Sequence, residues 1–254
     1  MSIARTCILA LFCAPAPAIP AAAAAEVSVA VAANFSAPLE AIADAFTAAT
    51  GHHVLVSAGA TGVLQAQITQ GAPFDVLLAA DETTPAKLEQ GGLAVRGTAR
   101  TYAVGRLVLW SARPGFVDER GDVLRAGGFA HLALANPDLA PYGAAARDVL
   151  EALGLTDAMA PRLVTGQNAA QAFQFVSSGS AELGFVARSQ VWRNGRLTSG
   201  SGWLVPAELH RPLRQDAVLL RHGADNPAAQ ALLRFLAEPA AVAIITAFGY
   251  EQEP

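Results

Sequence analysis

The sequence predicts an α/β protein of two lobes, each a mostly parallel sheet flanked by helices. Short apolar runs alternate with amphipathic helical stretches along the chain, which is the pattern of parallel strands joined by helices. A helix leads through Gly71-Ala72-Pro73 into an apolar strand, and a similar unit recurs at Gly179-Ser180-Ala181. No Ser/Gly-rich linker separates the two halves, which favours a hinge of crossing strands over a flexible tether.

The first half begins with a buried strand predicted over 27–33, followed by an amphipathic helix. Ser36 is expected to cap this helix and Gly51 to end it. Further strands are predicted over 53–56 and 74–80, with another helix between them. This order of elements predicts the first α/β lobe.

The second half repeats the alternation of strands and helices. Its strands are predicted over 107–110, 132–135, 163–164, 183–186 and 217–220. Helices are expected from about Gly143 and around Ala169, and two more close the chain.

The chain is expected to cross between the lobes near residues 102–110 and 210–218. These crossings predict that residues 26–104 plus 216–254 form lobe 1 and that residues 105–215 form lobe 2.

The first 25 residues have the pattern of a cleaved secretory signal peptide. Arg5 is the only charge before Glu26, and a short apolar run leads to small residues at the exit. The run is too short to span a bilayer. A lipoprotein anchored at Cys13 is the alternative, although Phe12 is a poor residue before such a cysteine. Because Cys7 and Cys13 both lie here, the mature chain would have no thiol or disulfide, as suits a periplasmic protein.

The composition excludes several classes of protein. The chain is 53% hydrophobic and 15% charged, which predicts a compact globular protein and not a disordered one. Its formal net charge is −4, Lys87 is its only lysine, and no cluster of basic residues occurs. A nucleic acid or an anionic membrane surface is therefore not expected as a partner.

Candidate binding residues lie in four turns where a strand is followed by a helix, spanning 32–36, 57–63, 136–143 and 165–169. In open α/β sheets, ligands bind beyond the carboxyl ends of the strands. Helix N-termini offer free N–H groups and partial positive charge there, so they bind anions without a formal cation.

Each turn has a functional and a structural interpretation. Asn34 could offer its amide to a ligand or act only as a cap or turn residue. Thr61 lies between glycines at a helix start, but such a turn is common and is no phosphate-binding loop. Tyr142 could offer a neutral O–H group or be an ordinary loop tyrosine. The fourth turn offers backbone N–H groups, or only helix capping by Thr165 or Asn168.

None of the four turns contains Lys, Arg or His. An anion bound there would be held by neutral hydrogen bonds and helix dipoles from both lobes. Such a site suits a fully ionised oxyanion better than a protonatable one.

Enzyme chemistry is not indicated. The sequence has no Gly-x-Ser-x-Gly elbow and no His-Glu-x-x-His motif. The pair His52-His53 is interpreted as a solvated turn, and Asp75 and Asp81 as structural turn residues. An exported enzyme on the same fold would require Asp75 or His131 to face the cleft.

At these turns the sequence resembles the periplasmic molybdate-binding protein family, the solute-binding component of the molybdate ABC importer. The resemblance covers essentially the whole mature chain, and the Gly71-Ala72-Pro73-Phe74-Asp75 segment is its most specific part. The matching stretches are residues 31–35, 57–62, 71–81, 135–137, 141–143, 183–186, 235–236 and 248–250.

The resemblance implies a two-lobed, type II-like periplasmic binding protein that needs no cofactor. It implies capture of molybdate or tungstate by lobe closure, then delivery to a membrane permease with a cytoplasmic ATPase. A monomer is expected. The oxyanion contacts fall on Asn34, Thr61, Tyr142 and Ala169, with further backbone contacts expected at Ala33, Gly62 and Asn168, and with no direct ligands to a metal cation.

One position departs from the family pattern. Many relatives have a tyrosine where this chain has Ala187, followed by Arg188. Either Tyr142 supplies the missing hydroxyl from another direction, or the site accepts another anion, such as sulfate, a phosphonate or a small organic acid.

Overall fold

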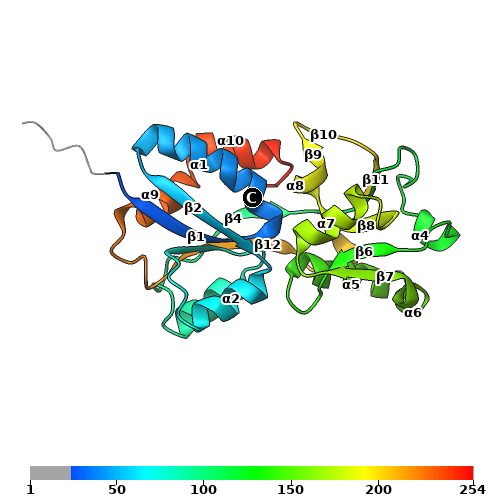
Figure 1. Cartoon of the computed structure of the whole chain (residues 1–254), viewed down its shortest axis with the longest axis horizontal. Helices are drawn as coiled ribbons and strands as arrows, with labels where there is room; N and C mark the ends of the chain where they lie inside the picture. Colours follow the sequence, from blue (N-terminus) through cyan, green and yellow to red (C-terminus); the bar gives the residue numbers. More distant parts are fainter. Residues whose placement is uncertain (1–23, 254) are drawn as a thin grey trace, which may run out of the picture.

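The structure, a computed structural model, describes residues 24–253 and contains two five-stranded sheets flanked by helices (Figure 1). This is the predicted fold class. Most of the predicted signal peptide, with Arg5, Cys7 and Cys13, falls on residues 1–23 and lies outside the described residues.

The first sheet has the strand order β2-β1-β3-β12-β4. Its strands are β1 (Glu26–Ala32), β2 (His53–Gly59), β3 (Val76–Leu78), β4 (Arg100–Gly105) and β12 (Leu213–Leu219). β1 pairs in parallel with β2 and β3, whereas β12 runs antiparallel to β3 and β4.

Helices cover both faces of the first sheet. One face packs against α1 (Ser36–Thr50), α9 (Pro227–Phe235) and α10 (Pro239–Ala247), and the other against α2 (Thr61–Thr69) and α3 (Thr83–Gln90). Figure 1 shows the two groups on opposite sides of the strands. Within residues 24–253, no single helix is long and apolar enough to cross a membrane. Only α9 and α10 taken together, as a bent pair, reach the length and apolar composition of a membrane-spanning helix.

The second sheet repeats the plan of the first, as the sequence predicted. Its order is β11-β5-β8-β6-β7, with β6 parallel to both β7 and β8, and β5 antiparallel to β8 and β11. The strands are β5 (Leu107–Ser111), β6 (Leu132–Ala135), β7 (Leu163–Gly166), β8 (Leu183–Ala187) and β11 (Ser201–Leu204). The helices are α4 (Val123–Ala126), α5 (Pro141–Ala152), α6 (Thr156–Met159), α7 (Ala169–Ser177) and α8 (Arg188–Val191).

Smaller elements complete the chain. Three 3₁₀ turns cover Ala33–Phe35 (η1), Ala160–Arg162 (η2) and Ala207–Leu209 (η3), and a short hairpin pairs β9 (Trp192–Arg193) with β10 (Arg196–Leu197).

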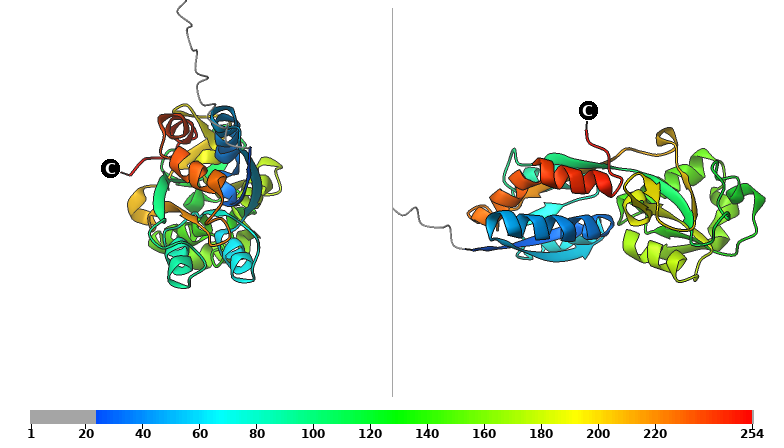
Figure 2. Two further views of the ribbon diagram at one scale, coloured as in Figure 1. Left: turned by 90° about the vertical axis from the view of Figure 1, so that its left-hand side faces the viewer. Right: turned by 90° about the horizontal axis from the view of Figure 1, so that it is seen from above.

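We call the first sheet with its helices the first lobe, and the second sheet with its helices the second lobe. The chain passes from one to the other at Arg106, between β4 and β5, and returns between β11 and β12. The right-hand view of Figure 2, in which the molecule is seen from above, shows the two lobes side by side along the long axis of the molecule. The predicted lobe boundaries lie near these passages. The division into two separate units, residues 26–104 plus 216–254 and residues 105–215, stays a prediction.

Two local predictions were wrong. Ser36 does not cap α1: a 3₁₀ turn precedes the helix, so Ser36 is its first residue and its hydroxyl donates to the Ala33 carbonyl at 3.2 Å. His52 is not solvated but only 7% exposed, and its Nδ1 accepts a hydrogen bond from the Ala25 N–H. Gly51 does end α1, in a left-handed conformation that favours glycine.

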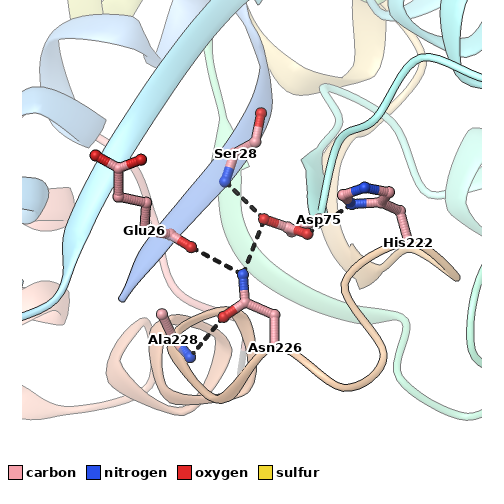
Figure 3. Close-up of polar contacts among 6 residues, drawn as sticks. All are labelled: Glu26, Ser28, Asp75, His222, Asn226 and Ala228. Atoms are coloured by element: carbon pink, nitrogen blue, oxygen red, sulfur yellow. Dashed lines mark hydrogen bonds and ion pairs between the residues drawn. The ribbon is translucent and has the colours of Figure 1, made fainter. Parts of the chain in front are cut away.

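A buried carboxylate joins three segments at the edge of the first sheet where β3 begins (Figure 3). Asp75 is 5% exposed, and its Oδ2 accepts hydrogen bonds from the Ser28 N–H at 2.8 Å and from Asn226 Nδ2 at 3.0 Å. Its Oδ1 lies 2.9 Å from Nδ1 of His222, whose side chain is 57% exposed. Asp75 therefore ties β1, β3 and the loop before α9 together.

Replacement of Asp75 by alanine should lower the free energy of unfolding by about 1–3 kcal/mol, because two buried donors lose their acceptor. The melting temperature should fall by several degrees in a chain of this size. His222→Ala is the matched control and should shift it little, since that side chain is largely solvated. Equal shifts for the two variants would show that Asp75 does not carry this stabilisation.

Candidate functional site

A small cavity lies between the two lobes, with an empty volume of about 190 Å³. Six of the seven predicted contact residues line it: Ala33, Asn34, Thr61, Tyr142, Asn168 and Ala169. Its other lining residues are alanine, glycine or proline, namely Ala32, Gly59, Ala60, Ala80, Ala140 and Pro141. Among the described residues, therefore, no charged side chain lines the cavity.

Four helix N-termini meet at this cavity. The starts of η1 and α2 come from the first lobe, and those of α5 and α7 from the second. The first N–H groups of a helix have no acceptor within the helix, and they carry its partial positive charge. The cavity is thus bordered by hydrogen-bond donors from both lobes, without any formal cation.

The Thr61 hydroxyl is arranged to donate. Its Oγ1 accepts a hydrogen bond from the Ala80 N–H at 3.1 Å, and the side chain is buried. A hydroxyl has one proton and two lone pairs, so the proton of Thr61 stays free for an acceptor in the cavity.

Tyr142 has the same arrangement on the second lobe. Its hydroxyl oxygen accepts a hydrogen bond from Gln215 Nε2 at 3.1 Å, and the residue is 3% exposed. Burial, with Tyr250 and Tyr102 nearby, raises the pKa of Tyr142 well above its ordinary value of 10. The hydroxyl therefore keeps its proton at neutral pH.

Asn34 has a different role from the one expected of its side chain. Both donors of its amide are engaged inside the protein, because Nδ2 donates to Gln215 Oε1 and to the Tyr250 hydroxyl, each at 2.9 Å. The interpretation that this amide is available to a ligand is therefore wrong. Asn34 still lines the cavity, and its backbone N–H, in the first turn of η1, has no acceptor within that helix.

The remaining predicted contacts divide into two kinds. The Gly62 N–H donates to the Leu139 carbonyl at 2.9 Å, so this group links the two lobes and is already occupied. The Asn168 side chain caps α7 by accepting from the Gln171 N–H at 3.0 Å, which holds the Ala169 N–H at the helix start. Ala187 is fully buried in the core of the second lobe and does not line the cavity.

A buried polar network, which no sequence motif predicts, lies behind the cavity. The Tyr102 hydroxyl shares its one proton between the Ala79 carbonyl at 3.1 Å and Gln215 Oε1 at 3.2 Å. The Asn34 carbonyl accepts from the hydroxyls of Ser189 at 2.8 Å and Tyr250 at 2.9 Å. Ser189 belongs to the second lobe, so the network joins both lobes at the start of η1. These residues are far apart in sequence and follow no motif.

All three tyrosines of the chain belong to this network. Burial raises the pKa of Tyr102 and Tyr142 well above 10 and that of Tyr250 to about 12. In the unfolded chain each should titrate near ~10. The folded protein holds these protons more tightly, so this stabilisation is complete below about pH 10 and is lost as the pH rises further.

Stability should therefore fall between about pH 10 and pH 12, with a slope of up to about 1.4 kcal/mol per pH unit for each tyrosine. Chemical denaturation across this range measures the fall, and tyrosinate absorbance reports on these three residues alone. Titration of all three near pH 10 in the folded protein would contradict the burial of the network.

A larger groove lies beside the cavity and is open to solvent, with an empty volume of about 990 Å³. Its charged lining residues are Asp81, Glu82, Lys87, Asp138, Arg211 and Arg214. Arg211 pairs with Asp148 and Arg214 with Glu82, so these cations already have carboxylate partners. Its mixed charge makes this groove a poorer anion site than the cavity.

The carboxylates considered for catalysis lie elsewhere. Asp75 precedes β3, whereas the cavity is lined by residues at the ends of β1 and β3, and His131 precedes β6 in the corresponding position of the second sheet. Asp81 accepts the Thr84 N–H at 2.6 Å in the first turn of α3, a structural role as predicted. No group of three or more His, Cys, Asp or Glu residues within 24–253 is placed to hold a metal ion.

Comparison with known proteins agrees with this geometry. A family model described as bacterial extracellular solute-binding protein matches residues 27–251. The molybdate-binding protein ModA of Azotobacter vinelandii is 60% identical over 230 residues, covering 91% of each chain. ModA of Rhodobacter capsulatus is 50% identical over 232 residues, covering 91% of this chain and 90% of that protein.

A solved structure gives the same result. The periplasmic molybdate-binding protein of Azotobacter vinelandii matches with a TM-score of 0.87 and 42% identity, over 90% of this chain and 100% of that chain. These relatives are named as binding proteins and none of them as an enzyme, in agreement with the prediction. The chain belongs to the bacterial extracellular solute-binding proteins and, within them, to the family of the molybdate-binding protein ModA.

Proposed function

We propose that this protein captures molybdate or tungstate in the cavity between its lobes and delivers the oxyanion to an ABC importer. The observation that carries the proposal is the uncharged cavity bordered by four helix N-termini and by the hydroxyls of Thr61 and Tyr142. The names of the ModA relatives support the choice of anion.

The contacts proposed for the oxyanion are all donors. Thr61 and Tyr142 would each donate a hydroxyl proton, and Ala169, Ala33 and Asn34 would donate backbone N–H groups. Hydrogen bonds to an ionised acceptor are stronger than those between neutral groups. Within residues 24–253, no carboxylate or imidazole lines the cavity to accept a proton from the ligand. A protonated oxyanion such as hydrogen phosphate would therefore leave its own O–H donor unpaired.

Capture would proceed by closure of the lobes on the oxyanion. A ligand shifts a conformational equilibrium only by as much as it prefers one state. Thr61 and Ala33 belong to the first lobe, whereas Tyr142 and Ala169 belong to the second. Only the closed arrangement offers all these donors to one ligand, so an oxyanion there would stabilise closure.

Export and delivery form the rest of the proposal. Residues 1–25 would direct the chain to the periplasm and be removed as a signal peptide. The mature protein would act as a monomer and pass its ligand to a membrane permease driven by a cytoplasmic ATPase. The match to bacterial extracellular solute-binding proteins supports this location.

Thermal unfolding of the anion-stripped mature protein tests the choice of ligand. Molybdate or tungstate at ~100 times its dissociation constant should stabilise the fold by ~2.7 kcal/mol, which raises the melting temperature by several degrees. Sulfate, phosphate and chromate at the same concentration serve as matched anions and should raise it less. A larger rise with sulfate, or no rise with any anion, would contradict the molybdate assignment.

A further inference from the structure

Gln215 occupies an unusual place for a polar side chain. It lies on β12, beside the return passage between the lobes, and is 0% exposed. The pairing of β12 with β4 shifts register between Gln215 and Asp216. Such a bulge changes the direction of a side chain relative to the regular pleat. Gln215 is thereby held among the polar side chains behind the cavity.

The two ends of the Gln215 amide face different partners. Its Oε1 accepts a hydrogen bond from Asn34 Nδ2 at 2.9 Å and shares the Tyr102 hydroxyl proton, at 3.2 Å, with the Ala79 carbonyl, all on the first lobe. Its Nε2 donates to the Tyr142 hydroxyl, on the second lobe, at 3.1 Å. The Asn34 amide, which can only donate at this end, holds the amide oxygen of Gln215 on the first-lobe side, and this leaves the N–H end toward Tyr142.

This orientation determines what the Tyr142 hydroxyl can do. An acceptor at this point would take the single hydroxyl proton, whereas a donor occupies a lone pair and leaves the proton free. Tyr142 lines the cavity, so the free proton is available to an oxyanion there.

Gly105 allows the close approach of these two side chains. A Cβ atom at Gly105 would lie 2.6 Å from Gln215 Nε2 and would overlap the Tyr142 hydroxyl. The absence of a side chain on the last residue of β4 thus leaves room for the contact.

We propose that Gln215 is a positioning residue that keeps the Tyr142 O–H group directed as a donor toward the bound oxyanion. The inference rests on the proposed function, because it concerns the same cavity. The side chain of Gln215 is oriented by a hydrogen bond from Asn34 of the first lobe, and it donates to Tyr142 of the second lobe. The donor is therefore correctly set only while the lobes are in contact, which links lobe closure to anion affinity.

A double-mutant cycle measured by isothermal titration with molybdate tests the coupling. Gln215→Met keeps the side-chain length but removes both hydrogen-bonding ends, and it should weaken binding about tenfold. In a Tyr142→Phe background the same change should weaken binding less than about threefold, since the hydroxyl it positions is gone. Tyr102→Phe removes only the weaker, shared contact at Gln215 Oε1 and keeps the Asn34 contact, so it should weaken binding clearly less than Gln215→Met does. Losses that simply multiply in the double variant would overturn the inference.

A second variant tests the orientation itself and does not depend on the behaviour of Gln215→Met. In Gln215→Glu, an ionised carboxylate would accept the Tyr142 proton, whereas the protonated acid can donate as the amide does. Because burial raises a carboxyl pKa, the affinity of this variant should recover between about pH 8 and about pH 5. Wild type should show no such recovery.

The same pH series in a Tyr142→Phe background separates positioning from charge repulsion. The recovery should largely disappear there if Gln215 acts through the tyrosine hydroxyl. An undiminished recovery would mean that the charge at position 215 repels the anion directly, and it would overturn the inference. If the wild-type protein binds no molybdate, the proposed function and this inference both fail. If the wild-type protein binds molybdate but the effects of Gln215→Met and Tyr142→Phe are additive in free energy, the inference alone fails.

Discussion

Replacement of Ala169 by proline should weaken molybdate binding by at least about 100-fold with little loss of stability, because it removes an anion-binding N–H group and places the ring in the cavity. Ala169 is the first residue of α7, where proline fits the helix. The chain itself begins α5, α9 and α10 with proline. The preceding residue, Asn168, has the extended conformation that a following proline requires.

Isothermal titration with molybdate measures the loss, and thermal unfolding without ligand measures the stability. Ala169→Gly is the matched control: it also changes the side chain but keeps the N–H group, so its affinity should stay close to wild type. Wild-type affinity in the proline variant would show that the start of α7 does not contact the anion.

Replacement of Tyr142 by phenylalanine should weaken molybdate binding by about 10- to 150-fold, because a hydrogen bond to a charged group contributes about 1.5–3 kcal/mol. The variant also leaves Gln215 Nε2 without its acceptor, so some stability is lost as well. Binding must therefore be measured well below the melting transition of the variant.

Tyr102→Phe is the matched control for this prediction. The Tyr102 hydroxyl also belongs to the buried network, where it donates to the Ala79 carbonyl at 3.1 Å, but the residue does not line the cavity. Its loss should lower stability without a large change in affinity. Equal losses of affinity in the two variants would point to a general loosening of the network and not to a direct contact by Tyr142.

Much of the fold could be predicted because the parallel strands are short and apolar and are followed by helices with clear periodicity. The strand over 132–135 was placed at its observed bounds, and Gly51 marked the end of α1. Local patterns do not fix where pairing begins or stops. The strand predicted over 74–80 is only Val76–Leu78, and α5 begins at Pro141, before the Gly143 expected. The sequence patterns did not predict α3, β4 or β11, nor the short helices α4, α6 and α8 or the β9–β10 hairpin.

The part of the site that consists of residues at helix N-termini could be predicted from the sequence. Turns after parallel strands converge at one edge of a sheet, so six of the seven proposed contacts line one cavity. The exception, Gly62, has its N–H group bound to Leu139 across the lobes, a pairing that depends on how the lobes meet.

The supporting residues could not be found in this way. Gln215 lies on an antiparallel strand and Tyr250 in the C-terminal segment, and long-range pairing alone brings them behind the cavity. The role of Asn34 depends on these two partners, which explains why its side chain was assigned to the ligand.

Anomalous diffraction from crystals grown with tungstate tests the central claim most directly, because tungsten identifies its own position. The account predicts one strong peak in the cavity between the lobes, with oxygens within hydrogen-bond distance of the Thr61 and Tyr142 hydroxyls and of the Ala169 N–H group. A peak beside Lys87, Arg211 and Arg214 in the open groove, or no peak from protein that binds tungstate in solution, would contradict it.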